Sequence, residues 1–467
     1  MRTLNATVLA LGLGALAAGS GATGVDTPPP GGKPRDFQLV EPEVVTLENG
    51  LTATLVEFGD VPKTTVLVNI RTGNLNEDGR TWLADLAGEL LKQGTEKTPA
   101  RDIASRAASM GGSLVVSTGA EETTVSIDVL EDHAADAVAL LAEVIQEPAF
   151  PESELERIRG DLQRQLSIAV TQPQQIATAA FARLIYGDHP FGKVLPEPGE
   201  LASYGIEDVR GYYEENFGAR RTRIYVGGRF DRDAMSAAIR DAFGPWTAGP
   251  EVYTDIPGTE AAQQFVLIDR PGAPQSTLRL GLPVADPSSP DWTSLSVMNT
   301  LLGGFFSSRI TGNIREDKGY TYSPRSVLAT RYRDTYWAEL ADVTSEHTGD
   351  SIREILAEIR GLQEEAPAES EMDRVRNYLT GSFVLGNASR FGILGQLAYV
   401  DFHGLDRDYL TSFVDRVEAV SPEDVRAAAE KWLKTDEMAL VVVGDAASVA
   451  PQLDALPELE DWLKPAD

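Results

Sequence analysis

The sequence predicts an α+β protein made of two homologous α/β-sandwich domains in tandem, each a mostly antiparallel sheet covered by helices. Length is the first reason, because 467 residues exceed what one hydrophobic core usually holds. A duplication is the second. ESELERIRGDL from Glu152 is echoed by ESEMDRVRNYL from Glu369, and IYVGG at Gly227 by VVVGD at Gly444, both at an offset of 217 residues. Each half also places alternating, strand-like segments before long helical runs.

The repeat defines the domain boundaries. We expect an N-terminal domain over 40–245, a Pro- and Gly-punctuated linker over 246–261, a C-terminal domain over 262–455 and a tail over 456–467. The period is far longer than that of solenoid repeats, so the repeating unit is a whole domain.

The elements follow the same order in both halves. Period-2 alternation predicts the strands, and 3.6-residue periodicity predicts long helices between the second strand pair and the last strand. The predicted strands are 51–60, 64–73, 113–120, 122–130 and 221–228 in the first half, and 263–269, 276–283 and 438–445 in the second. The long helices of the first half are expected over 133–147 and 152–172.

The N-terminus has the features of a secretory signal peptide. An arginine, the apolar run TVLALGLGALAAG and small residues predict a signal peptide over 1–22, and DTPPPGGKP lies in an extended tether over 23–39. No other stretch reaches the ~18 consecutive apolar residues of a membrane span. We therefore expect export across the inner membrane and a periplasmic protein with no membrane partner.

Composition restricts the classes of function. The net charge is −30, so the surface repels nucleic acid and would attract basic, extended peptides; solubility alone is the other explanation. The chain has no cysteine, which excludes disulfides, thiol catalysis and thiolate metal sites.

The segment TWLADLAGELLKQGT predicts an amphipathic helix with an unusual polar face. Its leucines at 83, 86 and 90 form a core stripe. Asp85 and Glu89 stand four residues apart, at metal-ligand spacing on one side of the helix. Zn²⁺ prefers nitrogen-rich sites, and none of the four histidines has a partner at helical spacing. We interpret the two carboxylates as a solvated helix face, with no metal bound by this chain; an unusual Asp85/Glu89 metal site in an autonomous enzyme is the alternative.

This helix resembles the zinc helix of the pitrilysin/insulinase superfamily of inverted-motif zinc peptidases, especially the two-domain kind similar to mitochondrial processing peptidase. The family pattern is Gly-Leu-Ala-His-x-x-Glu-His-(x)4-Gly-Thr. WLADLAGELLKQGT keeps its Leu, Ala and closing Gly-Thr, but has Asp85, Gly88 and Glu89 at the His, Glu and His positions. The family's third ligand, a glutamate, falls at Gln165. The resemblance implies a LuxS/MPP-like metallopeptidase fold and a subunit that has lost its own zinc site.

Two further segments resemble the family. GGSLVVSTG resembles its edge-strand region, which implies that Val115, Val116, Ser117 and Thr118 pair with a peptide substrate through main-chain hydrogen bonds; a purely structural strand is equally consistent. LLGGFFSSRITGNIREDKGYTYS resembles the C-terminal segment in which an arginine and a tyrosine assist a zinc site in the other domain or subunit.

That arginine and tyrosine correspond to Arg315 and Tyr322. We expect Arg315 to end a helix stopped by a left-handed Gly319, and Tyr322 to begin a strand, with Gly303 and Gly304 in a flexible loop or a simple turn. The guanidinium would fix a peptide carbonyl and the phenol would donate to a developing oxyanion. The alternative is an ion pair of Arg315 with a neighbouring acid and a half-buried Tyr322.

The sequence thus predicts a non-catalytic subunit of a secreted, heterodimeric zinc metallopeptidase. Zinc and the catalytic helix are expected in a homologous partner subunit, and peptides are the expected substrates. A purely structural or peptide-binding pseudo-peptidase on the same scaffold is the alternative.

Overall fold

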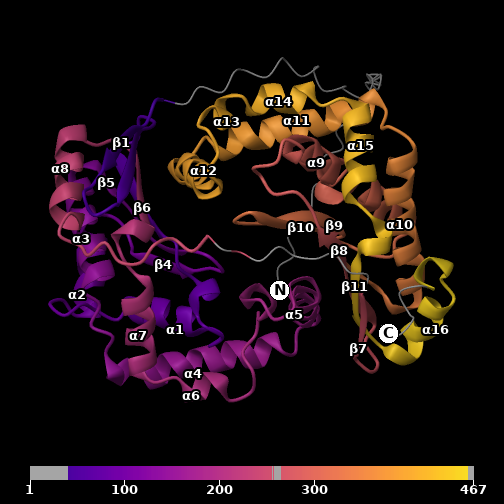
Figure 1. Cartoon of the computed structure of the whole chain (residues 1–467), viewed down its shortest axis with the longest axis horizontal. Coiled ribbons are helices and arrows are strands. Elements are labelled where there is room, and N and C mark those ends of the chain that lie inside the picture. Colours follow the sequence, from indigo (N-terminus) through magenta and orange to yellow (C-terminus); the bar gives the residue numbers. More distant parts are fainter. Residues whose placement is uncertain (1–39, 255, 257–263, 461–467) are drawn as a thin grey trace, which may run out of the picture. The chain divides into compact units, whose positions relative to one another are not determined.

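A computed structural model describes residues 40–254, 256 and 264–460 (Figure 1). The expected signal peptide and tether lie outside the described residues, as do parts of the expected linker and tail. Within the described part, no helix is both long and apolar enough to span a bilayer.

The first half contains a six-stranded sheet in the order β1-β2-β6-β3-β5-β4. The strands are β1 (Glu43–Thr46), β2 (Thr52–Glu57), β3 (Lys63–Ile70), β4 (Val115–Thr118), β5 (Thr123–Leu130) and β6 (Thr222–Gly228). Only the β2–β6 pair is parallel; the other pairs are antiparallel.

The second half contains a five-stranded sheet in the order β7-β11-β8-β10-β9. Its strands are β7 (Gln264–Asp269), β8 (Gln275–Pro283), β9 (Arg325–Arg331), β10 (Asp334–Thr344) and β11 (Ala439–Gly444). Apart from β1, the order is that of the first sheet, and β7–β11 is again the one parallel pair. Two homologous sheets in tandem, each covered by helices, confirm the predicted fold class.

Helices cover both sheets at matching positions. In the first half they are α1 (Leu83–Leu91), α2 (Ala100–Ser109), α3 (Ala134–Gln146), α4 (Glu152–Ala169), α5 (Pro173–Tyr186), α6 (Glu200–Ser203), α7 (Ile206–Asn216) and α8 (Arg232–Phe243). In the second half they are α9 (Trp292–Asn299), α10 (Thr348–Glu364), α11 (Glu369–Gly386), α12 (Arg390–His403), α13 (Asp408–Thr411), α14 (Phe413–Ala419), α15 (Pro422–Trp432) and α16 (Ala446–Asp454). Two π-helical segments, η5 (Thr300–Gly304) and η6 (Thr311–Asp317), follow α9, and short 3₁₀ turns include η1 (Asn74–Asn76).

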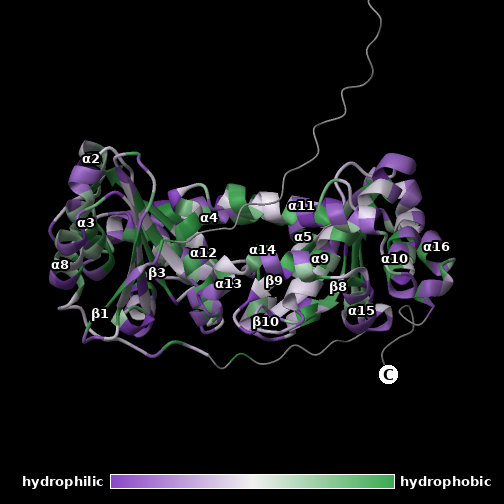
Figure 2. Ribbon diagram, turned by 90° about the horizontal axis from the view of Figure 1, so that it is seen from above, coloured by the Kyte–Doolittle hydropathy of each residue, from purple (hydrophilic) through white to green (hydrophobic). Residues whose placement is uncertain are grey.

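The core of each half lies between its sheet and its helices. In the first half, Leu83, Leu86 and Leu90 of α1 are fully buried, as their spacing predicts. Figure 1 shows α3 and α8 side by side next to the strands of this sheet. Hydrophilic and hydrophobic residues alternate along helices such as α8 and α10, which is typical of helices buried on one face (Figure 2).

The two halves also exchange equivalent helices. Phe181 of α5 packs with Val441 of β11 in the second sheet. Leu394 of α12 packs with Val56 and Tyr225 in the first sheet. The strands β6 and β11 are therefore covered on both faces, which explains why nearly every residue of both is buried and why β11 reads as a run of valines.

Close contact at this exchange explains part of the repeated strand motif. A Cβ atom at Gly227 would lie 2.9 Å from Leu394 Cδ2, so a glycine there admits α12. An ion pair adds polar contact, because Arg390 Nη2 of α12 lies 2.9 Å from Asp128 Oδ1 of β5. Sequence periodicity does not reveal this exchange, since it reports which face of an element is buried and not by which partner.

Candidate functional site

The degenerate motif lies on α1, whose N-terminus is held by a buried carboxyl group. Trp82 precedes the helix in a left-handed conformation (φ 67°) and provides no side-chain cap. Glu77 takes this role, because the Ala84 amide donates to its Oε1 at 2.9 Å. Asn74 Nδ2 lies 2.7 Å from Glu77 Oε1 and 2.7 Å from Asp85 Oδ2, so one amide group links both acids.

Burial dominates the electrostatics of this linked pair. It raises the pKa of Glu77 to about 8, although hydrogen bonds from Asn74 and Ala84 oppose the shift. The pKa of Asp85 is also raised by burial. The interpretation of Asp85 as part of a solvated face was wrong, because a fixed hydrogen bond to Asn74 holds it. Glu77 was missed, although an acid shortly before a helix that lacks an N-cap residue is a usable signal.

Gly88, at the family's catalytic glutamate position, is closed off by strand β4. A Cβ atom at Gly88 would lie 2.2 Å from Thr118 Oγ1, far inside van der Waals contact. Thr118 Oγ1 points toward the Ala84 carbonyl of the same helix, at 3.5 Å. The glycine thus allows β4 to pack directly on α1, and no larger side chain fits unless the Thr118 side chain or the strand moves.

Glu89 and Gln165 lie on the same cavity, of about 400 Å³, between α1 and α4. The Glu89 carboxylate pairs with Lys92 Nζ at 2.7 Å and is 44% exposed, as a solvated helix face predicts. This donor set does not fit zinc, since the cavity offers the lysine-paired Glu89, the carboxamide of Gln165 and Asp161, which pairs with Arg157 and Arg164, but no nitrogen ligand. Asp85 is hydrogen-bonded to Asn74. The described residues hold no cluster of three or more His, Cys, Asp or Glu side chains suited to a metal.

Strand β4 has the geometry that peptide addition requires. It pairs with β5 on one side only, from Val115↔Ser126 to Thr118↔Thr123, and is the last strand of its sheet. Val115 is 52% exposed. The main-chain groups of residues 115–118 on the other side are therefore placed to pair with an extended peptide, and the assignment of these residues to substrate binding stays a prediction.

Arg315 and Tyr322 lie close together on the second half. The Arg315 guanidinium carbon lies 4.8 Å from the centre of the Tyr322 ring and 4.5 Å from that of Phe306. Arg315 Nε also pairs with Glu316 Oε1 at 3.0 Å. Tyr322 is 79% exposed and Phe306 62%, so two aromatic faces flank one cation at the surface.

Two details of this segment differ from the sequence prediction. Tyr322 precedes β9, which begins at Arg325, so it does not begin a strand. Gly303 and Gly304 end the π-helix η5 and are not in a loop. A Cβ atom at Gly303 would lie 2.8 Å from Oε2 of the fully buried Glu339, so the glycine accommodates a carboxyl group beneath it. Gly319 is left-handed, with φ 67°, as expected for the end of a helix.

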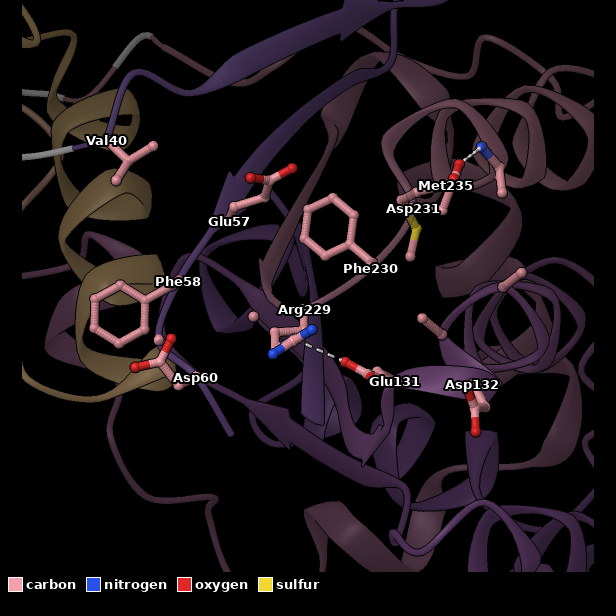
Figure 3. Close-up of a pocket in the computed structure, with 15 residues that line it drawn as sticks. Val40, Glu57, Phe58, Asp60, Glu131, Asp132, Arg229, Phe230, Asp231 and Met235 are labelled. Carbon is pink, nitrogen blue, oxygen red and sulfur yellow. Dashed lines mark hydrogen bonds and ion pairs between the residues drawn. The ribbon is translucent and has the colours of Figure 1, made fainter. Parts of the chain in front are cut away.

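A larger cavity, of about 790 Å³, lies elsewhere in the first half (Figure 3). Phe58, Phe230 and Met235 supply apolar surface, and Arg229 pairs with Glu131 at 3.0 Å. None of the residues that the sequence singled out lines it. Its acids are exposed or already paired. Because it shares no lining residue with the degenerate motif, this cavity is separate from that motif.

Comparison with known proteins places this geometry in context. Residues 58–199 match the family model of insulinase (peptidase family M16), and residues 204–379 match that of the peptidase M16 inactive domain. The chain is 24% identical over 408 residues to the uncharacterized zinc protease YmxG of Bacillus subtilis (strain 168), covering 86% of this chain and 98% of that protein.

Two further similarities extend over most of the chain. A probable mitochondrial-processing peptidase subunit beta of Arabidopsis thaliana is 22% identical over 418 residues, covering 86% of this chain and 78% of that protein. The crystal structure of a peptidase M16 inactive domain from Pseudomonas fluorescens superimposes with a TM-score of 0.81 at 22% identity, covering 87% of this chain and 98% of that one.

Proposed function

Because the chain belongs to the M16 (insulinase) peptidase family, we propose that it is the non-catalytic subunit of a heterodimeric zinc metallopeptidase. A homologous partner carries the zinc helix. This chain contributes Arg315, Tyr322 and part of the chamber that holds the peptide. The pairing with a homologous subunit is supported by the similarity to a protein named as a processing-peptidase subunit.

One observation carries the proposal: the motif positions Asp85 and Gly88 are occupied by contacts with neighbouring side chains, while the Arg315–Tyr322 pair is open. Thr118 occupies the space above Gly88, and Asn74 holds Asp85. Tyr322, by contrast, is exposed, and the Arg315 guanidinium lies against its ring. An exposed phenol can donate a hydrogen bond to a developing oxyanion, and the guanidinium can bind a carbonyl oxygen of the peptide.

Peptide cleavage by a zinc-bearing M16 partner, measured with and without this chain, tests the proposal. We expect the wild-type chain to increase the kcat/KM of the partner. With Tyr322→Phe, the kcat/KM of the mixture should be about 10²–10³-fold lower than with wild type, the usual effect of losing one oxyanion donor. Arg315→Ala should reduce it as well. Arg353→Ala, on the exposed side of α10, and Tyr253→Phe, a partly exposed phenol, are the matched controls. If both Arg315→Ala and Tyr322→Phe increase kcat/KM as much as wild type does, the proposal is wrong.

A purely structural or peptide-binding pseudo-peptidase is the second candidate. The Arg315–Glu316 ion pair favours it, because it gives the arginine a local partner that needs no substrate. This candidate predicts that Arg315→Ala and Tyr322→Phe leave partner activity unchanged, while deletion of the whole chain destroys the assembly. The same cleavage assay, combined with size-exclusion chromatography of the mixture, separates the two.

We also place the mature protein in the periplasm, on the strength of the signal-like residues 1–22. Fractionation of cells that express the full chain, compared with a chain lacking these residues, tests the location. Recovery of both chains in the cytoplasmic fraction would contradict it.

A further inference from the structure

A third cavity, of about 430 Å³, lies where the β4–β5 turn of the first half meets β9 and α12 of the second half. Its polar and aromatic lining comes from both halves: Asn69, Glu122, Arg331, Tyr399, Phe402 and His403. It shares no residue with the degenerate motif or with the Arg315–Tyr322 pair.

Two polar groups around this cavity are already committed. The Arg71 guanidinium lies between the rings of Tyr332 and Phe402, 4.7 and 4.2 Å from their centres, and points toward the Phe402 carbonyl at 3.4 Å. The Glu121 carboxylate accepts a hydrogen bond from the Tyr332 amide at 3.0 Å. Both contacts join the halves, and neither group is available to a ligand.

Two other groups, His403 and Glu122, keep unused hydrogen-bonding capacity. His403 is 3% exposed, and its Nδ1 has no hydrogen-bond partner among the described residues. Burial lowers the pKa of His403 to about 4, so the ring is neutral and one nitrogen is an acceptor. Glu122 Oε2 accepts from Asn69 Nδ2 at 3.2 Å, and burial raises the pKa of Glu122 to about 7 although Arg71 and Arg223 oppose the shift.

A buried acceptor and a buried, poorly compensated carboxyl group on one cavity are costly unless a donor occupies it. The rings of Tyr399 and Phe402 lie 4.5 and 4.9 Å from the His403 ring, and aromatic faces of this kind attract cations. Carboxylate, imidazole acceptor and aromatic ring together match an organic cation that carries N–H donors.

We propose that this cavity binds a primary ammonium or guanidinium group, with Glu122 compensating its charge, His403 accepting one N–H and Tyr399 covering its face. Arg331, which also lines the cavity, adds N–H donors for an acceptor on the same ligand. A basic residue of a peptide carries such an acceptor in its carbonyl group, whereas a free polyamine-like molecule does not. The site belongs to this chain alone and does not rest on the proposed subunit role.

Isothermal titration calorimetry on the purified full chain tests the proposal with four probes: agmatine, Nα-acetyl-argininamide, Nα-acetyl-citrullinamide and acetate. We expect the two guanidinium probes to bind one per chain, and neither the uncharged citrulline probe nor acetate to bind. Tighter binding of acetyl-argininamide than of agmatine would assign the site to a basic peptide residue, and the reverse order to a free amine; both orders support a cation site.

Variants test the roles of Glu122 and His403. Glu122→Gln keeps an acceptor for Asn69 but removes the charge, and should weaken both guanidinium probes by at least about tenfold. Glu207→Gln, an exposed acid on α7, should leave the dissociation constants unchanged. His403→Phe keeps the ring stacking, removes the acceptor and supplies a second test if Glu122→Gln does not fold. Absence of binding by both guanidinium probes, equal binding of the citrulline probe, or unchanged affinity in both site variants would overturn the proposal.

Discussion

Replacing Gly88 by alanine tests whether strand β4 closes the degenerate motif. The new Cβ would lie 2.2 Å from Thr118 Oγ1, so the Thr118 side chain, the strand or the helix must shift. Overpacking of this kind costs about 1–3 kcal/mol, and alanine recovers roughly 1 kcal/mol of helix propensity over glycine. We therefore expect Gly88→Ala to destabilise the protein by about 0–2 kcal/mol.

The sign of the effect should reverse once the threonine is removed. In a Thr118→Ala background the obstructing oxygen is absent, so Gly88→Ala retains only the propensity gain and should stabilise by up to ~1 kcal/mol. The coupling between the two positions is then about 1–3 kcal/mol, within the range measured for residues in direct contact.

Thermal unfolding of the four chains, followed by circular dichroism, measures this coupling. Gly211→Ala on α7 is the matched control, because nothing lies within 4 Å of a Cβ built there. It should stabilise both the wild-type and the Thr118→Ala chain equally. Additive effects of Gly88→Ala and Thr118→Ala would refute the reasoning, since two side chains that do not compete for space cannot couple.

Three further outcomes are expected. Burial raises the pKa of Glu77 to about 8, so the folded state binds more protons than the unfolded state between pH 4.5 and about 8. The free energy of unfolding should therefore fall as pH rises through that window. Glu77→Gln should flatten this dependence, measured by urea unfolding at pH 5 and pH 9. Arg390→Met, which removes the ion pair with Asp128, should lower the free energy of unfolding by about 1.5–3 kcal/mol. The control Arg353→Met, on the exposed face of α10, should lower it by less than about 0.5 kcal/mol. Phe181→Ala empties the contact of α5 with the second sheet and should cost about 3–5 kcal/mol, seen as a lower midpoint of thermal unfolding; a midpoint within experimental error of wild type would show that α5 does not hold the halves together.

The architecture was largely predictable, because it depends on local periodicity and on repetition along the chain. Alternating residues marked β3 and β5, and the short apolar runs that end in glycine marked β6 and β11. The 217-residue offset between Glu152 and Glu369 reappears as the first residues of α4 and α11. Such signals depend on neighbours in sequence, so a single chain carries them in full.

The details of the candidate site were less predictable, because they depend on contacts between distant segments. Nothing near Asp85 in sequence indicates that Asn74 will hold its carboxylate. The position of Tyr322 was expected in a strand, but the chain turns from Gly319 to Arg325 before β9 begins. The pairing of Glu122 with Asn69, across β3 and the β4–β5 turn, likewise appears only in three dimensions.

The structure changes the meaning of the lost zinc motif. Replacing ligands alone would leave an open pocket beside α1, from which a few substitutions could restore a metal site. Here a cavity remains at Glu89 and Gln165, but the space around the other two positions has been reused. Thr118 fills the position above Gly88, and Asn74 joins Asp85 to the buried cap of the helix at Glu77. Both contacts fix α1 against neighbouring segments, so a substitution that restored a ligand would also remove a packing or capping interaction. The same contacts hold the inner side of β4 on α1, while its outer edge is unpaired within the described sheet, so α1 supports the edge strand that we propose to pair with a peptide.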